Sequence, residues 1–158
     1  MTFRLFTDAS VNPKTKIGYG AYLIVDEDKL AGDIRKTDVK TKRFENTSSS
    51  KLELEALLWA FGEIDLENRK IVVYTDCQNI IGLERRRKKL QSANYFSKKN
   101  NLIKNHELYK EFYERVDLAQ VEFVKVEGHK KENEKDEIDK IFTLVDKASR
   151  SALRENRA

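Results

Sequence analysis

The chain has 158 residues, of which 39% are hydrophobic and 37% charged, and its net charge is +4. This length is that of one domain with a sizeable core, so we expect a single domain over residues 1–158. The chain has a lone cysteine, no apolar run of about 18 residues and no apolar stretch at its start. We therefore expect no internal disulfide, no membrane span, no signal peptide and a cytoplasmic protein. Two histidines and one cysteine also exclude the usual Cys/His zinc site.

The first half of the chain predicts a hairpin, a further strand and a helix. Residues 2–8 and 17–25 have the composition and alternation of strands, and the turn between them holds the only proline. We expect another strand between about 30 and 46. A serine cap followed by Leu54, Leu57, Leu58 and Phe61 predicts a helix over 50–65, because these apolar residues fall at i, i+3, i+4 and i+7.

The second half alternates between strands and helices. The expected elements are a strand over 70–75, helices over 77–89 and 105–116, a strand over 119–129 and a closing helix over 136–155. This order favours an α/β fold with a mixed five-stranded sheet flanked by helices. A right-handed crossover would make the strands 2–8 and 70–75 parallel neighbours.

Two of the predicted strands end in the same dipeptide, Thr-Asp. The stretch FRLFTDAS carries Asp8, and IVVYTDCQN carries Asp76. Parallel neighbouring strands bring their carboxyl ends to one edge of a sheet, which is where α/β proteins hold their sites. We therefore expect Asp8 and Asp76 to lie together.

The helix over 50–65 offers a third carboxylate, from Glu53 or Glu55. On a helical wheel of about 100° per residue, Glu53 lies roughly 80° from the centre of the apolar stripe, and Glu55 roughly 120° on the other side. Glu53 is better placed to reach inward, by a small margin.

The closing helix adds further acids. Asp139 and Asp146 are one heptad apart beside the apolar stripe, and their spacing does not choose between them. Carboxylates that converge on one edge repel one another unless a cation lies among them. Oxygen ligands select Mg²⁺ or Mn²⁺, and two such ions about 3.5–4 Å apart are the arrangement that splits phosphodiesters. The acids thus predict a metal-dependent nuclease.

Residues 85–104 form a strongly basic segment. It carries eight Lys and Arg residues and no Asp or Glu, so the rest of the chain has a net charge of −4 within the total of +4. A local block of this kind favours nucleic-acid binding over the alternative of a solvated surface loop. His129, at the end of the stretch 119–129 that is expected as a strand, is either a surface residue or a group that transfers protons.

A series of motifs in the right order resembles the ribonuclease H family, in its type I bacterial branch, over nearly the whole chain. FTDAS resembles the family's Thr-Asp-Gly-Ser, IGYGAYLIV its following strand, YTDCQNI its Thr-Asp-Ser-Gln and VEGHK its Gly-His. KLELEALLWA resembles the helix that carries the catalytic glutamate, which the resemblance assigns to Glu53. VDKASRSAL resembles the closing helix, which selects Asp146 over Asp139.

The resemblance implies a ribonuclease H-like fold and endonucleolytic hydrolysis of the RNA strand of RNA/DNA hybrids, which leaves 5′-phosphate ends. It implies a catalytic set in which Asp8, Glu53, Asp76 and Asp146 hold two Mg²⁺ ions, with Mn²⁺ as a substitute. His129 would assist product release or proton transfer. We expect a monomer that does not bind membranes.

The resemblance also implies nucleic-acid contacts. The basic segment resembles the family's basic protrusion, where Tyr95 and Phe96 either stack on the nucleic acid or pack the loop against the body. The chain departs from the family's pattern at three places. Ala9 stands where the family has Gly, and Ser49 and Ser50 lie where it carries Asn. The spacing from His129 to Asp146 is longer than the family leads us to expect. The predicted contact residues are Ala9, Asn12, Ser49, Ser50, Arg85, Arg86, Arg87, Lys88, Lys89, Lys98 and Lys99.

Two alternatives remain at this point. The serines and the longer spacing motivate one alternative, a related nuclease that cuts junction DNA or duplex RNA. A non-catalytic nucleic-acid-binding module would keep the fold, although it would have no reason to retain mutually repelling acids.

Overall fold

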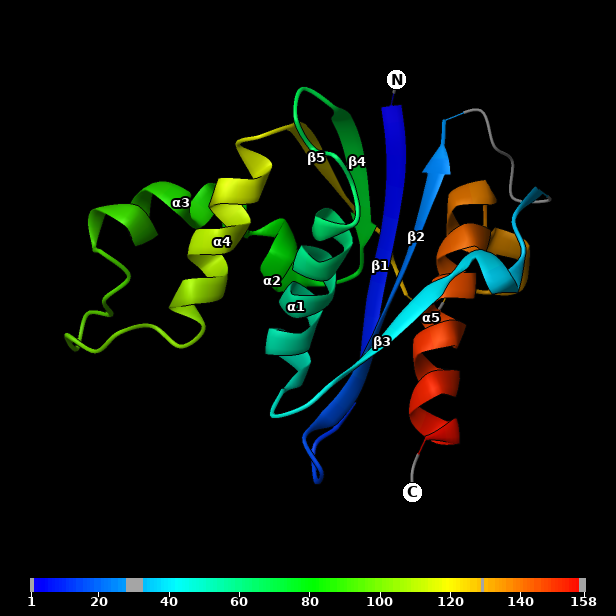
Figure 1. Ribbon diagram of the computed structural model, residues 1–158, viewed down its shortest axis with the longest axis horizontal. Coiled ribbons are helices and arrows are strands. Elements are labelled where there is room, and N and C mark those ends of the chain that lie inside the picture. Colours follow the sequence, from blue (N-terminus) through cyan, green and yellow to red (C-terminus); the bar gives the residue numbers. More distant parts are fainter. Residues whose placement is uncertain (1, 28–32, 129, 157–158) are drawn as a thin grey trace.

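The computed structural model describes residues 2–27, 33–128 and 130–156 (Figure 1). Its centre is a five-stranded sheet in the order β3-β2-β1-β4-β5. The strands are β1 (Thr2–Asn12), β2 (Ile17–Asp26), β3 (Lys40–Phe44), β4 (Lys70–Thr75) and β5 (Gln120–Lys125). The β1–β2 and β2–β3 pairs are antiparallel, whereas β1–β4 and β4–β5 are parallel. The predicted mixed five-stranded sheet, with β1 and β4 as parallel neighbours, is confirmed.

The helices follow the predicted order with one difference. They are α1 (Ser49–Gly62), α2 (Gln78–Ile81), α3 (Leu83–Ser92), α4 (His106–Val116) and α5 (Glu137–Glu155), with 3₁₀ turns η2 (Lys36–Asp38) and η3 (Glu132–Glu134). The single helix expected over 77–89 is divided into α2 and α3 at Gly82, a residue type that weakens a helix interior by about 1 kcal/mol. Within the described part of the chain, no helix has the length and apolar character needed to cross a membrane.

β1 is longer than predicted, and Asp8 does not lie at its end. β1 pairs with β4 only from Thr2 to Phe6, but it continues to Asn12 in its pairing with β2. Asn12 Oδ1 accepts a hydrogen bond from Lys14 N at 2.9 Å, which organises the turn at the end of this long hairpin. Asp8 therefore lies on β1 just beyond the last pair with β4, and Asp76 directly follows β4.

The sheet separates two apolar layers, as Figure 1 shows with α1 and α4 on one face and α5 on the other. Leu5 packs in the layer with α1 and α4, and its neighbour Phe6 packs in the layer with α5. Both side chains are fully buried, as expected where successive residues of a strand point to opposite faces of a doubly covered sheet. β1 is thus central in the fold.

A glycine on β2 allows α1 to approach the sheet closely. A Cβ on Gly20 would lie 2.7 Å from the Cβ of Ala56, a separation that real Cβ atoms essentially never show. Ala56 is fully buried and lies one helical turn after Glu53. The close contact therefore brings the part of α1 that carries Glu53 against the sheet.

Candidate active site

Three carboxylates from different elements meet beside the central strands. Asp8 on β1, Glu53 on α1 and Asp76 after β4 each offer an oxygen, and these atoms all lie within 4.8 Å of one another. Asp8 is 4% exposed, whereas Glu53 and Asp76 are half-buried. The structure thus brings together three acids that the sequence predicts as partners.

The Thr-Asp dipeptide has a local structural role at the end of β4. Thr75 is fully buried, and its Oγ1 accepts a hydrogen bond from Cys77 N at 3.1 Å. Such a bond from a side chain to the backbone two residues on stabilises a turn. The strand therefore ends with Asp76 in a fixed turn at the edge of the core.

The electrostatics of the cluster disfavour three negative charges. Burial, the charge of Glu53 and a hydrogen bond with Asp146 raise the pKa of Asp8 to about 10. Burial and the charge of Asp76 raise the pKa of Glu53, while a hydrogen bond with Asp8 partly offsets the rise. Acids that share a desolvated site cannot all ionise without a compensating positive charge. Protons or cations must supply it.

The donor set fits a hard divalent cation. Glu53 Oε2 is fully buried and has no hydrogen-bond partner among the described residues. A buried acceptor without a donor is costly, and coordination of a cation would satisfy it. Glu55 is different, because its Oε1 accepts a hydrogen bond from Thr47 Oγ1 at 2.5 Å. The arrangement favours Glu53 over Glu55 as the metal ligand.

On α5, Asp146 rather than Asp139 is turned toward the cluster. Asp146 is close enough to Asp8 to hydrogen-bond with it, and it also forms an ion pair with Arg150 at 3.2 Å. Asp139 is 7% exposed and receives hydrogen bonds from Asp136 N and Lys130 Nζ, both at 3.1 Å. Its first role is to cap α5, since its side chain and that of Asp136 form a reciprocal capping box.

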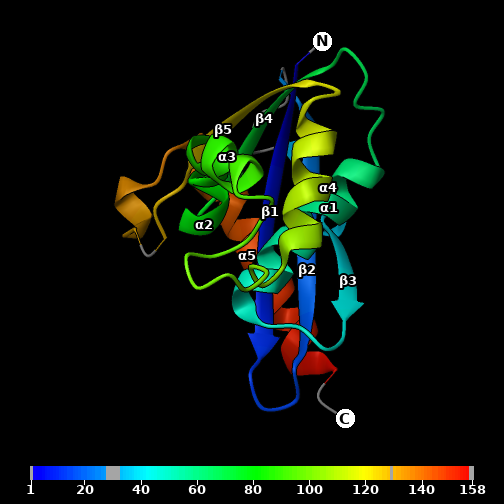
Figure 2. The same cartoon turned by 90° about the vertical axis from the view of Figure 1, so that its left-hand side faces the viewer.

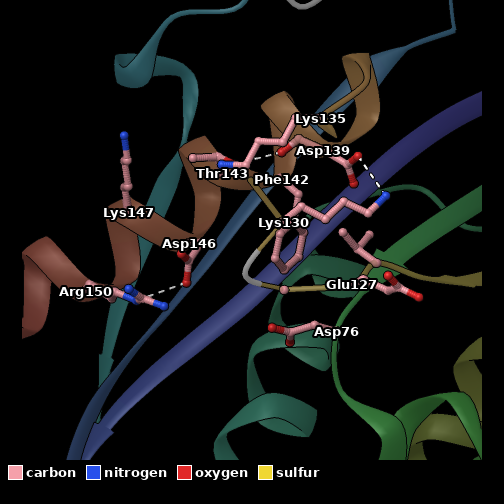
Figure 3. Close-up of a pocket in the computed structure, with 12 residues that line it drawn as sticks. Asp76, Glu127, Lys130, Lys135, Asp139, Phe142, Thr143, Asp146, Lys147 and Arg150 are labelled. Carbon is pink, nitrogen blue, oxygen red and sulfur yellow. Dashed lines mark hydrogen bonds and ion pairs between the residues drawn. The ribbon is translucent and has the colours of Figure 1, made fainter. Parts of the chain in front are cut away.

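Asp76 and Asp146 line opposite sides of one cavity of about 210 Å³ (Figure 3). Gly128 lies directly beside Asp76, because a Cβ at this position would be 3.8 Å from Asp76 Oδ2. Lys130 and Arg150 add positive charge to the same lining. His129 lies outside the described residues, so its predicted role stays a prediction.

The basic segment lies on α3 and the chain that follows it, which extend away from the sheet (Figures 1 and 2). Two of its predicted contact residues are engaged by the protein itself. Arg86 donates to the Asn79 backbone oxygen at 2.9 Å, and Arg87 forms a bidentate pair with Asp117 at 2.7 and 2.6 Å. The exposed cations among the predicted contact residues of this segment are Arg85, Lys88, Lys89, Lys98 and Lys99.

The two aromatic residues of this segment differ in environment. Tyr95 is 6% exposed and belongs to the core layer of α1 and α4, whereas Phe96 is 41% exposed. Tyr95 therefore packs the segment against the body, as one of the two sequence interpretations expected. Phe96 is the aromatic side chain that remains accessible to a ligand.

The other predicted contact residues lie near α1 and the hairpin. Ala9 is half-buried opposite Gly20, and the Asn12 side-chain oxygen is occupied within its turn. Ser49 and Ser50 are exposed in the first turn of α1, after Ser48, which caps the helix. The two exposed serines are thus the more accessible members of this group.

Sequence reasoning did not predict the capping role of Asp139 or the ion pairs that Lys130 and Arg150 form beside the cavity. The spacing Asp136-x-x-Asp139 before an apolar stripe indicates a capping box. Arg150 stands four residues after Asp146, a spacing at which opposite charges meet on a helix. Both features are visible in the sequence, whereas the contact of Lys130 with Asp139 is tertiary.

A mixed five-stranded sheet with acids gathered beside its central strands has the architecture expected of a ribonuclease H-like protein. Residues 2–147 match the RNase H family. The chain is also similar to the ribonuclease H of Caldicellulosiruptor saccharolyticus (strain ATCC 43494 / DSM 8903 / Tp8T 6331). The two are 30% identical over 121 residues, which cover 72% of this chain and 74% of that relative. The chain therefore belongs to the RNase H family.

Proposed function

We propose that this protein is an endoribonuclease that hydrolyses the RNA strand of RNA/DNA hybrids with the help of divalent cations. The observation that carries the proposal is the meeting of Asp8, Glu53 and Asp76 within 4.8 Å in the fold of the RNase H family. The similarity to a protein named ribonuclease H supports the choice of substrate. We propose further that residues 1–158 act as one catalytic domain.

Asp8, Glu53 and Asp76 would hold the cations, with Asp146 as a fourth ligand from α5. Two bound Mg²⁺ ions, or Mn²⁺ in their place, would activate water and stabilise the leaving oxygen of the phosphodiester. The chain's own contribution is to present desolvated carboxylates whose mutual repulsion favours cations among them. His129 would transfer a proton or assist product release.

The exposed cations of the basic segment would hold the nucleic acid. Lys88, Lys89, Lys98 and Lys99 are all exposed, so their ammonium groups can approach phosphates without breaking an internal ion pair of the described residues. Phe96 offers an accessible ring for stacking on a sugar or base. Phosphate contacts position the duplex, and the carboxylate cluster would then act on one strand.

The decisive test compares one labelled sequence prepared as RNA/DNA hybrid, duplex RNA, single-stranded RNA and duplex DNA. Each substrate is incubated with Mg²⁺ and, separately, with EDTA. We expect cleavage of the hybrid's RNA strand alone, only with the metal ion, and products with 5′-phosphates. Cleavage of duplex RNA or of a DNA junction instead would keep the metal-dependent chemistry and replace the substrate. Binding without cleavage in Mg²⁺ and in Mn²⁺ would contradict the proposed activity.

A further inference from the structure

Arg150 forms an ion pair with Asp146, the acid that the proposed function assigns as the fourth metal ligand. Its Nε lies 3.2 Å from Asp146 Oδ1, and both residues line the cavity that contains Asp76 (Figure 3). Asp146 does not belong to the group of acids whose oxygens meet within 4.8 Å, which consists of Asp8, Glu53 and Asp76. The fourth acid is thus close to the cluster but paired with a cation from its own helix.

This pair competes with metal coordination. A carboxylate that coordinates a divalent ion gives up much of its attraction to a neighbouring guanidinium, because the positive ion repels that group. The side chains of Arg150 and Asp146 are 55% and 27% exposed, so water screens their ion pair and it is easily exchanged. Arg150 is therefore suited to hold Asp146 reversibly.

The position of Arg150 would let it contact a nucleic-acid phosphate once Asp146 coordinates a cation. It lies one helical turn beyond Asp146 at the border of the cavity, where its exposed guanidinium is accessible to a nucleic-acid phosphate beside the cluster. Guanidinium groups bind phosphates through several hydrogen bonds at once. Lys130 has less freedom to make this change, since it is paired with the buried Asp139.

We propose that Arg150 is a positioning residue that exchanges partners: it orients Asp146 when the centre lacks cations and contacts a substrate phosphate when Asp146 coordinates one. The inference rests on the proposed function, since it requires a metal centre that includes Asp146. It makes cation binding and nucleic-acid binding mutually favourable through one side chain. Such coupling acts equally in both directions.

The first test measures the affinity for Mg²⁺ of the protein without nucleic acid, by calorimetry. The variant is Arg150→Gln, and the matched control is Arg154→Gln, which removes the same charge one turn further along α5. Arg154 is exposed and contacts Ser151 Oγ rather than an acid. We expect Arg150→Gln to tighten Mg²⁺ binding about two- to fivefold relative to Arg154→Gln, as removal of an exposed competing ion pair allows. Equal effects, or weaker binding in Arg150→Gln, would overturn the proposal.

The second test measures affinity for an RNA/DNA hybrid over a range of salt concentrations, in EDTA and in Ca²⁺. Calcium also takes oxygen ligands, and electrophoresis checks that the RNA strand stays intact during the measurement. We expect Arg150→Gln to weaken hybrid binding in Ca²⁺ and to lower the salt slope by about 1, which corresponds to one phosphate fewer bound by the protein. In EDTA the same substitution should have little effect, because Arg150 is then held by Asp146.

A decrease in hybrid affinity that is the same in EDTA and Ca²⁺ would mean that Arg150 binds a phosphate whether or not a cation is present, and it would contradict the exchange.

The unsubstituted protein's cleavage of the hybrid is measured alongside. If the metal affinities follow the expected order but no hybrid is cut, the proposed function fails and the competition for Asp146 stands. If cleavage occurs and Arg150→Gln behaves as Arg154→Gln, the partner exchange fails and the function stands.

Discussion

Gly20 on β2 faces Ala56 on α1 so closely that a methyl group on Gly20 would lie 2.7 Å from the Ala56 side chain. Ala56 is one turn from Glu53, so this contact couples the packing of the core to the geometry of the acid cluster. We expect Gly20→Ala to lower the free energy of unfolding by about 1–3 kcal/mol, the usual cost of overpacking. It should also reduce cleavage, because α1 must move away from the sheet.

Gly62 provides the matched control, since a Cβ there meets nothing within 4 Å. Gly62→Ala should leave the stability unchanged or raise it by up to about 1 kcal/mol, as alanine is favoured over glycine in helices. Urea denaturation measures both variants. Equal stabilities for Gly20→Ala and the unsubstituted protein would show that the sheet and α1 separate without cost.

Glu53 and Glu55 lie two residues apart on α1 but have different surroundings. Glu53 reaches the acid cluster, whereas Glu55 accepts a hydrogen bond from Thr47. We expect Glu53→Gln to abolish Mg²⁺-dependent cleavage and Glu55→Gln to retain it, with a decrease in stability of about 1 kcal/mol or less from the altered hydrogen bond. A cleavage assay with the hybrid decides between them, and an active Glu53→Gln variant would refute the assignment.

The raised pKa of Asp8 predicts how the stability of the metal-free protein depends on pH. An unfolded aspartate titrates at a pKa of about 4, whereas burial raises the pKa of folded Asp8 to about 10. Between these two values the folded protein binds more protons than the unfolded chain, so the free energy of unfolding falls as pH rises. The stabilisation that protonated Asp8 gives the folded protein is complete below pH 4 and is lost as pH rises toward about 10.

Asp8→Asn removes that pH dependence because the amide does not ionise. At pH 8 in EDTA, the unsubstituted chain must take up a proton at Asp8 when it folds, whereas the amide of Asp8→Asn needs none. We therefore expect the variant to melt about 2–8 °C higher, from about 1–2 kcal/mol of avoided protonation cost. Addition of Mg²⁺ should raise the melting temperature of the unsubstituted protein more than that of Asp8→Asn. A variant that melts lower in EDTA at pH 8 would contradict the proposed repulsion.

Substitutions of Asp139 and Asp146 on α5 should separate metal binding from stability. Asp146 contacts Asp8 and should contribute to cation affinity, so Asp146→Asn is expected to weaken Mg²⁺ binding with little change in stability. Asp139 caps α5 and pairs with Lys130, so Asp139→Asn should lower the free energy of unfolding by about 1 kcal/mol and leave Mg²⁺ affinity nearly unchanged. Calorimetry measures the Mg²⁺ affinity of the two variants, and urea denaturation measures their stability. Loss of Mg²⁺ affinity in Asp139→Asn, but not in Asp146→Asn, would assign Asp139 as the metal ligand instead.

The basic segment should show a similar separation between binding and stability. Lys88, Lys89, Lys98 and Lys99 are exposed, so their replacement by alanine should weaken hybrid binding. The salt slope of binding should fall by about 1 for each of these lysines that binds a phosphate. Stability should change by less than about 0.5 kcal/mol per residue. An unchanged salt slope in all four variants would show that the segment does not hold the hybrid.

Arg87 is the contrasting residue, because it pairs with Asp117 and its guanidinium lies 5.0 Å from the ring centre of Tyr113. Arg87→Ala should lower the free energy of unfolding by about 0.5–1 kcal/mol, since the pair is partly exposed. Its salt slope for hybrid binding should stay close to that of the unsubstituted protein. A large drop in that slope would assign Arg87 to the nucleic acid instead.

Local patterns were sufficient to predict much of this protein. The apolar periods of residues 50–65 and 136–155 predicted α1 and α5, because a helix must bury one stripe against the sheet. The Thr-Asp pairs at Asp8 and Asp76 predicted a shared edge, since the order of strands and helices made β1 and β4 parallel neighbours. Resemblance to a family was needed to select Glu53 and Asp146 from the nearby acids.

Tertiary structure decided the features that depend on distant partners. The full length of β1 follows from its pairing with β2, and the burial of Tyr95 reflects the core layer of α1 and α4. Asp139 also forms an ion pair with Lys130, which lies in the loop before η3. Periodicity tells which side of an element is apolar, but burial and charge pairing depend on what lies opposite. For that reason the sequence determined the elements and the candidate acids, whereas only the folded chain determined which charges are paired and which are free to meet a ligand.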